Sequence, residues 1–88
     1  MTEATATIVN SLGMHARPAA QVVRLASSFT SSIELECHGQ TTNAKSIMGV
    51  MTLAAETGAT VRVRATGGDA DAAVAALVAL IASGFGET

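Results

Sequence analysis

The amino-acid sequence predicts an α+β fold in which helices cover one face of a four-stranded antiparallel sheet. Short stretches of alternating apolar and polar residues, typical of strands, are interspersed with stretches whose apolar residues recur at helical spacing. Two predicted strands are separated by only two residues, a connection that only antiparallel strands allow. The chain has 88 residues, enough for one thin hydrophobic core, so we expect a single domain over residues 1–88.

The first half of the chain predicts two strands and one long helix. Residues 4–9 (ATATIV) alternate small or apolar side chains with threonines, as expected for a strand. Residues 16–27 predict a helix whose apolar residues recur at intervals of three and four positions: Ala19, Val22, Val23 and Ala26. A serine-rich segment ends this helix, and residues 32–37 (SIELEC) alternate as a strand.

The middle of the chain predicts a hairpin and a short helix. His38 and Gly39 form a two-residue loop that leads into a short strand over residues 40–43. Ser46 then caps a short helix that begins at Ile47, which stabilises the helix by about 1 kcal/mol.

The last third predicts one strand and one helix. Residues 60–66 (TVRVRAT) alternate between valine or alanine and arginine or threonine. Asp69 is a helix-start signal for a helix over residues 70–83. Gly84 follows where a left-handed cap is expected to end that helix.

Composition excludes several classes of function. The net charge is −2, without a basic run, tryptophan or tyrosine, which argues against nucleic-acid binding. Cys37 is the only cysteine, so an internal disulfide is excluded and a cysteine-based metal site is implausible. The polar N-terminus is no signal peptide, and no apolar run approaches the ~20 residues of a membrane span. We therefore expect a soluble, cytoplasmic protein.

The segment GMHARPA, residues 13–19, lies where a predicted strand gives way to a predicted helix. A structural interpretation accounts for most of it: Gly13 makes the turn, and Pro18 fits the first helical turn. In that interpretation His15 is a polar cap and Arg17 a solvated charge. A histidine and an arginine are not required by either the turn or the helix start.

A chemical interpretation uses those two residues. A helix N-terminus presents unpaired N–H groups and partial positive charge, so it favours anions and an uncharged His15. If the ring takes up a phosphoryl group, the N–H groups of Ala16 and Arg17 can receive its oxygens, and the guanidinium of Arg17 matches phosphate geometry. Pro18 fixes the backbone in advance. Hydrolysis would need an acid or base beside the histidine, and none lies nearby in the sequence.

The segments GMHARPAA (residues 13–20) and NAKSIMGVMTL (residues 43–53), at this spacing, resemble the histidine-containing phosphocarrier (HPr) family of the bacterial phosphoenolpyruvate:sugar phosphotransferase system. The likeness extends over the whole chain. It implies an open-faced β-sandwich, four antiparallel strands with three helices on one side, in the order βαββαβα. It also implies phosphorylation of His15 on Nδ1, with Arg17 beside the phosphate.

The resemblance also implies the partners. The donor is phosphorylated enzyme I, charged from phosphoenolpyruvate, and the acceptor is a histidine on an A-type enzyme II domain. Neither a metal nor a cofactor belongs to such a carrier, which is not a stand-alone enzyme. We expect it to act as a monomer.

The second segment carries a candidate regulatory and docking surface. A one- or two-turn helix cannot bury every side, so some of Ile47, Met48 and Met51 should face water as an adaptable apolar patch for partners. The resemblance implies phosphorylation of Ser46 by HPr kinase/phosphorylase in some bacteria, which would place negative charge beside the patch. Arg24 is equally consistent with contact to an acidic partner and with a solvated charge.

Two further functions stay open at this point. The chain can be a regulatory binding module that acts through Ser46 and the methionine-rich patch, or a small enzyme with a covalent phosphohistidine. The branch of the system is also open, sugar transport or nitrogen-related regulation. Ser27, Gln40 and Gly49 stand where some relatives are basic, which weakens attraction to acidic partners.

Overall fold

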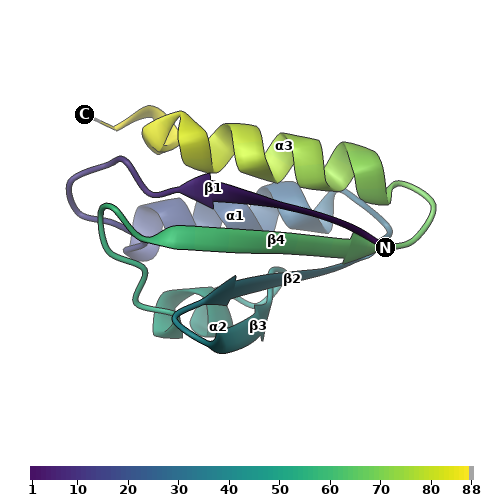
Figure 1. Ribbon diagram of the computed structural model, residues 1–88, viewed down its shortest axis with the longest axis horizontal. Helices are drawn as coiled ribbons and strands as arrows, with labels where there is room; N and C mark the ends of the chain where they lie inside the picture. The colour runs from purple at the N-terminus through teal and green to yellow at the C-terminus, as the bar shows by residue number, and fades with distance from the viewer. Residues whose placement is uncertain (88) are drawn as a thin grey trace.

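The computed structural model describes residues 1–87 and contains one sheet with its helices (Figure 1). The elements in chain order are β1 (Thr2–Thr7), α1 (Ala16–Ser27), β2 (Ser32–Cys37), β3 (Gln40–Asn43), α2 (Ile47–Thr52), β4 (Thr60–Thr66), α3 (Ala70–Ala82) and the 3₁₀ turn η1 (Gly84–Gly86).

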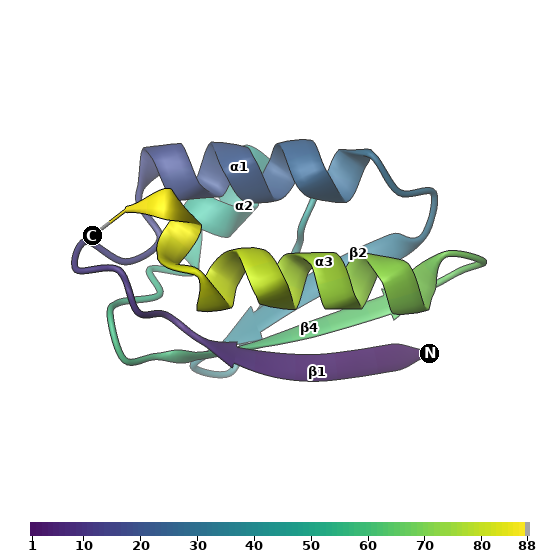
Figure 2. The same ribbon diagram turned by 90° about the horizontal axis from the view of Figure 1, so that it is seen from above.

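The four strands form a single antiparallel sheet in the order β1-β4-β2-β3. Seen from above, α1, α2 and α3 lie on one side of this sheet, and the other side is uncovered (Figure 2). The predicted fold class is therefore confirmed. β1 and β3 are the edge strands, and α1 connects β1 to β2, which are separated in the sheet by β4.

The core lies between the sheet and the helices and is built mainly from aliphatic side chains, with Phe85 as its one aromatic ring among the described buried residues. Ile33, Leu35, Val61 and Val63 point inward from β2 and β4 and are at most 2% exposed. Their strand neighbours point to the open face, where arginines and glutamates form ion pairs: Arg62 with Glu3 and Glu36, and Arg64 with Glu34 and Glu36. Alternation along the strands therefore separates a dry face from a charged one, as predicted.

The first strand ends two residues earlier than residues 4–9 predicted. Its last pair is Thr7 with Thr60, and Ile8 adds one more backbone bond, from its N to the O of Ala59 at 2.9 Å. Ile8 is buried, but Val9 is 56% exposed, because the chain turns there toward the start of α1. The prediction was too long because the apolar residues Ile8 and Val9 follow the last residue of β1 that pairs with β4.

The two predicted turns are confirmed by backbone angles. His38 and Gly39 have φ of 54° and 79°, the left-handed values that a tight two-residue hairpin requires. Gly84 has φ of 76° directly after α3, which ends at Ala82 with Ser83 as its cap. The last helix is thus one residue shorter than predicted.

Asp69 begins α3 at the N-cap position but does not cap it with its side chain. Its carboxylate instead accepts hydrogen bonds from the N of Thr30, at 2.9 Å, and from the N and Oγ of Ser31. The hydroxyl of Ser31 and these backbone N–H groups lower the pKa of Asp69 to about 2. The residue that sequence assigned to helix capping therefore ties the α1–β2 connection to the β4–α3 turn.

Candidate functional site

Gly13 fixes the place at which α1 begins. Its φ is +67°, and a Cβ there would lie 2.5 Å from the carbonyl oxygen of Ala55. The next residue, Met14, donates its N–H to the same oxygen at 2.8 Å and is itself buried. Only glycine fits this approach of two backbones, so the β1–α1 loop is held against the segment that follows α2.

His15 occupies the N-cap of α1 with an extended backbone, and its side chain makes no capping bond to the helix. The first helical hydrogen bond back to this residue joins the N of Ala19 to the O of His15, at 2.9 Å. The N–H groups of Ala16 and Arg17 therefore have no helical acceptor, and Pro18 has no N–H. The side chain of His15 is 35% exposed, so a histidine within reach of solvent stands beside two unused donors.

Arg17 and its neighbours differ in burial. Ala16 and Arg17 are exposed, while Pro18 is buried against the core. Within residues 1–87 the guanidinium of Arg17 forms no hydrogen bond or ion pair, although its charge acts on the carboxylate of Glu87, so its donors are available to an anion. The expectation that His15, Ala16, Arg17 and Pro18 form one corner is thus met in their placement, while the chemistry assigned to them stays a prediction.

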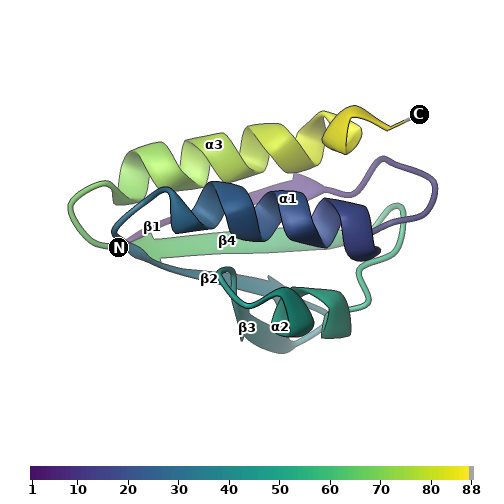
Figure 3. The same cartoon turned by 180° about the vertical axis from the view of Figure 1, so that it is seen from behind.

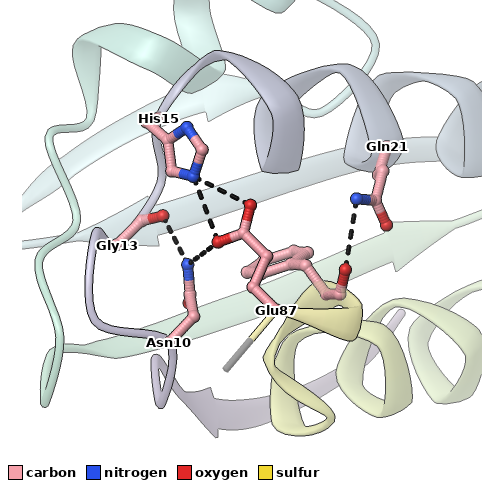
Figure 4. A network of polar contacts seen from close by, with 6 residues as sticks. Asn10, Gly13, His15, Gln21 and Glu87 are labelled. Carbon is pink, nitrogen blue, oxygen red and sulfur yellow. Dashed lines mark hydrogen bonds and ion pairs between the residues drawn. The ribbon is translucent and has the colours of Figure 1, made fainter.

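A carboxylate that sequence analysis did not assign lies against the histidine. The C-terminal segment lies at the same end of the molecule as the start of α1 (Figure 3). The Oε1 and Oε2 of Glu87 lie 3.1 and 2.9 Å from the Nε2 of His15 (Figure 4). The bond to His15 is the main cause of a lowered pKa for Glu87, and the amide of Asn10 and the charge of Arg17 lower it further. Sequence analysis found no acid close to His15 in the chain. It missed Glu87 because 72 positions separate the two residues.

Asn10 is the second residue that sequence analysis missed. It is 1% exposed, and its Nδ2 donates to the O of Gly13 at 2.8 Å and to the Oε1 of Glu87 at 3.0 Å. A polar residue at the end of an apolar strand, next to a glycine turn, is the only sequence signal for this role. The signal for Glu87 is weaker still, a single acid in the tail GFGET.

The second segment is placed as its motif predicts. The Oγ of Ser46 accepts a hydrogen bond from the N of Gly49 at 3.2 Å and so caps α2. Val50 is fully buried, whereas Ile47, Met48 and Met51 are 43%, 78% and 45% exposed. These three side chains form what we call the α2 patch.

Arg24 is exposed in the last turn of α1. Nine residues separate it from His15, about 13 Å along the helix axis. Its charge therefore lies at the opposite end of the helix from the histidine.

The described residues contain no group of three or more His, Cys, Asp or Glu side chains that could hold a metal ion. None of the helices in that part of the chain has the length and apolar character needed to cross a bilayer. A cleft of about 520 Å³ is lined by Ser31, Glu34, Lys45 and Arg64, among others. Met1 is among its lining residues, and His15 is not.

Comparison with known proteins identifies the family. A family model described as "PTS HPr component phosphorylation site" matches residues 2–83. The chain belongs to the HPr family. The phosphocarrier protein HPr of Cupriavidus necator is 47% identical over 87 residues, which cover 99% of this chain and 98% of the relative. HPr of Xylella fastidiosa strain Temecula1 is 46% identical with the same coverage.

Solved HPr structures share the fold. The crystal structure of HPr-C-His from Thermoanaerobacter tengcongensis superposes with a TM-score of 0.94 at 49% identity, covering 100% of this chain and 99% of that one. An HPr dimer from the same organism gives 0.78 at 49% identity, covering 99% and 100%. As a member of the HPr family the chain is a phosphoryl carrier of the phosphotransferase system, with other proteins of that system as partners.

Proposed function

We propose that Nδ1 of His15 accepts the phosphoryl group from phosphorylated enzyme I and passes it to a histidine on an A-type enzyme II domain. One observation carries this assignment. The Nε2 of His15 is occupied by Glu87, while its other ring nitrogen points away from that carboxylate (Figure 4). Nδ1 is thus the atom left for chemistry, on a ring that stands at the open N-terminus of α1.

The residues that follow His15 stabilise the transferred group. The unbonded N–H groups of Ala16 and Arg17 can donate to phosphoryl oxygens, and the guanidinium of Arg17, which has no ion-pair partner among residues 1–87, can bind two of them in parallel. Pro18, buried in the first turn, holds these donors in place before the phosphoryl group arrives. Transfer between two histidines depends on in-line placement and charge stabilisation, which such a rigid corner provides.

Labelling tests the proposal. The protein is incubated with enzyme I and ³²P-phosphoenolpyruvate, and the label is examined for the acid-labile, base-stable behaviour of phosphohistidine. We expect label in wild type and in His38→Ala, and none in His15→Ala. Label that survives in His15→Ala, or wild type that takes none, contradicts the proposal.

The α2 patch is the surface we assign to docking of enzyme I. Its exposed methionines are flexible and polarizable, so they adapt to more than one partner. Arg24 is assigned to the rim, where it meets acidic groups of a partner. Met48 is the most exposed of the three, so Met48→Ser should raise the KM for the carrier in transfer from enzyme I without unfolding the protein. An unchanged KM contradicts this docking role.

Phosphorylation of Ser46 is the regulatory step we assign, with HPr kinase/phosphorylase as the modifying enzyme. Ser46 directly precedes the α2 patch, so a phosphate would add about two negative charges next to an apolar contact surface. Ser46→Asp keeps an acceptor for the cap and adds one charge. We expect it to accept phosphoryl from enzyme I more slowly while its melting temperature stays near that of wild type; equal rates contradict the assignment.

A regulatory binding module is the second candidate function, favoured by the exposure of the α2 patch. The two candidates separate in one experiment: a labelled protein that cannot pass its phosphoryl group to any A-type domain, but still binds a partner through the patch, is such a module. Transfer to sugar-specific or nitrogen-related A-type domains then identifies the branch. Size-exclusion chromatography tests the expected monomer.

A further inference from the structure

The Glu87–His15 contact belongs to a network that reaches into the protein. Both carboxylate oxygens of Glu87 lie within hydrogen-bond distance of one ring nitrogen, and Oε1 also accepts from the amide of Asn10 (Figure 4). The side chain of Glu87 is 19% exposed, less than that of His15. A contact made by three side chains, one of them fully buried, is more than a chance encounter of surface groups.

The C-terminal segment is anchored before it reaches the histidine. Phe85 is 4% exposed, and its carbonyl accepts a hydrogen bond from the Nε2 of Gln21 in α1, at 3.2 Å. The N of Glu87 bonds back to the O of Gly84 at 2.9 Å. A buried aromatic ring and two hydrogen bonds therefore fix the backbone from which Glu87 extends.

The orientation of the Asn10 amide is determined by its neighbours. Its Nδ2 faces two acceptors, the carbonyl of Gly13 and the carboxylate of Glu87. A reversed amide would place Oδ1 against both, which is unfavourable since neither has a proton to donate. Oδ1 is buried without a partner among the described residues, a cost that the native structure accepts. Asn10 therefore holds Oε1 of Glu87 in place, and the lowered pKa of Glu87, caused chiefly by the bond to His15, keeps this carboxylate ionised at neutral pH.

An ionised carboxylate can only accept hydrogen bonds, so Nε2 of His15 must carry the proton in this contact. A neutral imidazole that is protonated on Nε2 has its lone pair on Nδ1. We infer that Glu87, held by Asn10, is a positioning residue that keeps His15 in the Nε2–H tautomer and so directs the phosphoryl group to Nδ1. This inference rests on the proposed function and adds two residues to it.

The transfer step balances without a proton acceptor. The lone pair of Nδ1 forms the new P–N bond, and the electrons of the old P–N bond return to the ring nitrogen of the donor phosphohistidine. His15 then carries the phosphoryl group on Nδ1 and the proton on Nε2, so the ring is positive and faces the carboxylate of Glu87. When the group is passed on, the P–N electrons return to Nδ1, and Nε2 has kept its proton throughout.

Nitrogen-15 NMR of the ring tests the inference on unphosphorylated protein, at a pH where the imidazoles are neutral. In wild type we expect His15 to show a protonated Nε2 and an unprotonated Nδ1, with almost none of the other tautomer. Glu87→Ala should raise the Nδ1–H fraction severalfold, to the level of an unconstrained imidazole, whereas Glu87→Gln, which keeps an acceptor oxygen, should stay close to wild type. Glu56→Ala, which releases the exposed His38, provides that reference and should leave His15 unchanged.

The same variants are compared in phosphoryl acceptance from enzyme I. Loss of a carboxylate that orients a reacting imidazole is expected to slow acceptance about tenfold in Glu87→Ala, with partial rescue in Glu87→Gln and no effect of Glu56→Ala. An unchanged tautomer in Glu87→Ala, a glutamine variant that behaves like alanine, or an unchanged rate overturns the inference. If His15 shows a fixed tautomer but the protein takes no phosphate label, only the proposed function is contradicted. The nitrogen-15 spectrum is measured on unphosphorylated protein and does not depend on phosphoryl transfer.

Discussion

The protein contains two histidines, and each has its Nε2 within hydrogen-bond distance of a glutamate. His15 contacts Glu87 at 2.9 Å and His38 contacts Glu56 at 2.7 Å. In the first pair the two side chains are 35% and 19% exposed, and in the second 56% and 64%. By distance alone the second pair is the closer one, so the contact itself does not distinguish a phosphoryl acceptor from a turn residue.

The surroundings distinguish them. His15 precedes two N–H groups without helical acceptors, and Arg17 stands beside it without an ion-pair partner in the described chain. His38 lies in a hairpin, and Arg62, which lines the same shallow cleft, is already paired with Glu3 and Glu36. Under the proposed function, it is the free donors around the ring, rather than the histidine–carboxylate contact, that would suit a corner to hold phosphate.

Substituting the glycine beside each histidine should give the largest difference. Gly13→Ala should lower the free energy of unfolding by more than about 3 kcal/mol, because a left-handed φ is combined with a clash against the carbonyl of Ala55. Gly39 also has a positive φ, but a Cβ added there would have no atom within 4 Å. For Gly39→Ala we therefore expect the free energy of unfolding to fall by only about 1–2 kcal/mol. Urea denaturation measures both; equal losses would mean that the first corner is not tightly packed.

Removing the arginine near each histidine should give the next largest effect. Arg17→Ala should reduce kcat/KM for phosphoryl acceptance about 10- to 100-fold, since hydrogen bonds to a charged group are worth about 1.5–3 kcal/mol. Arg62→Ala removes exposed ion pairs on the open sheet face and should change the rate less than about twofold. Steady-state transfer from enzyme I measures both, and a similar loss in the two variants would remove the distinction drawn between them.

The pH dependence of the two glutamates should give the smallest effect. The folded protein lowers the pKa of Glu87, through His15 first and then Asn10 and Arg17, and it lowers the pKa of Glu56 through His38. Each contact therefore stabilises the fold above the unfolded pKa of the carboxyl, and that stabilisation is lost as pH falls through the folded pKa.

Carbon-13 titration of the carboxyls measures these values. His15→Ala should raise the pKa of Glu87, because the hydrogen bond to His15 is the largest cause of its lowering. His38→Ala should raise the pKa of Glu56. Wild-type carboxyls that both titrate in the usual range would mean that neither contact persists in solution.

Local patterns in the sequence were enough for the elements and for most of the corner. Alternation placed β2 and β4, and the His38-Gly39 pair placed the hairpin and with it β3, because these features depend on neighbours in the chain. Glu87 and Asn10 could not be predicted, since their roles depend on a contact between segments 77 positions apart. Asp69 was assigned to the correct turn, but its carboxylate serves a loop 38 and 39 positions earlier in the chain.

The central claim is that this corner, and not the other histidine, carries phosphate on Nδ1. The most direct measurement is the one-bond ³¹P–¹⁵N coupling in ring-labelled protein after phosphorylation by enzyme I and phosphoenolpyruvate. The account predicts a single coupling, to Nδ1 of His15, with the signals of His38 unchanged. A coupling to Nε2 of His15, or to either nitrogen of His38, would contradict it.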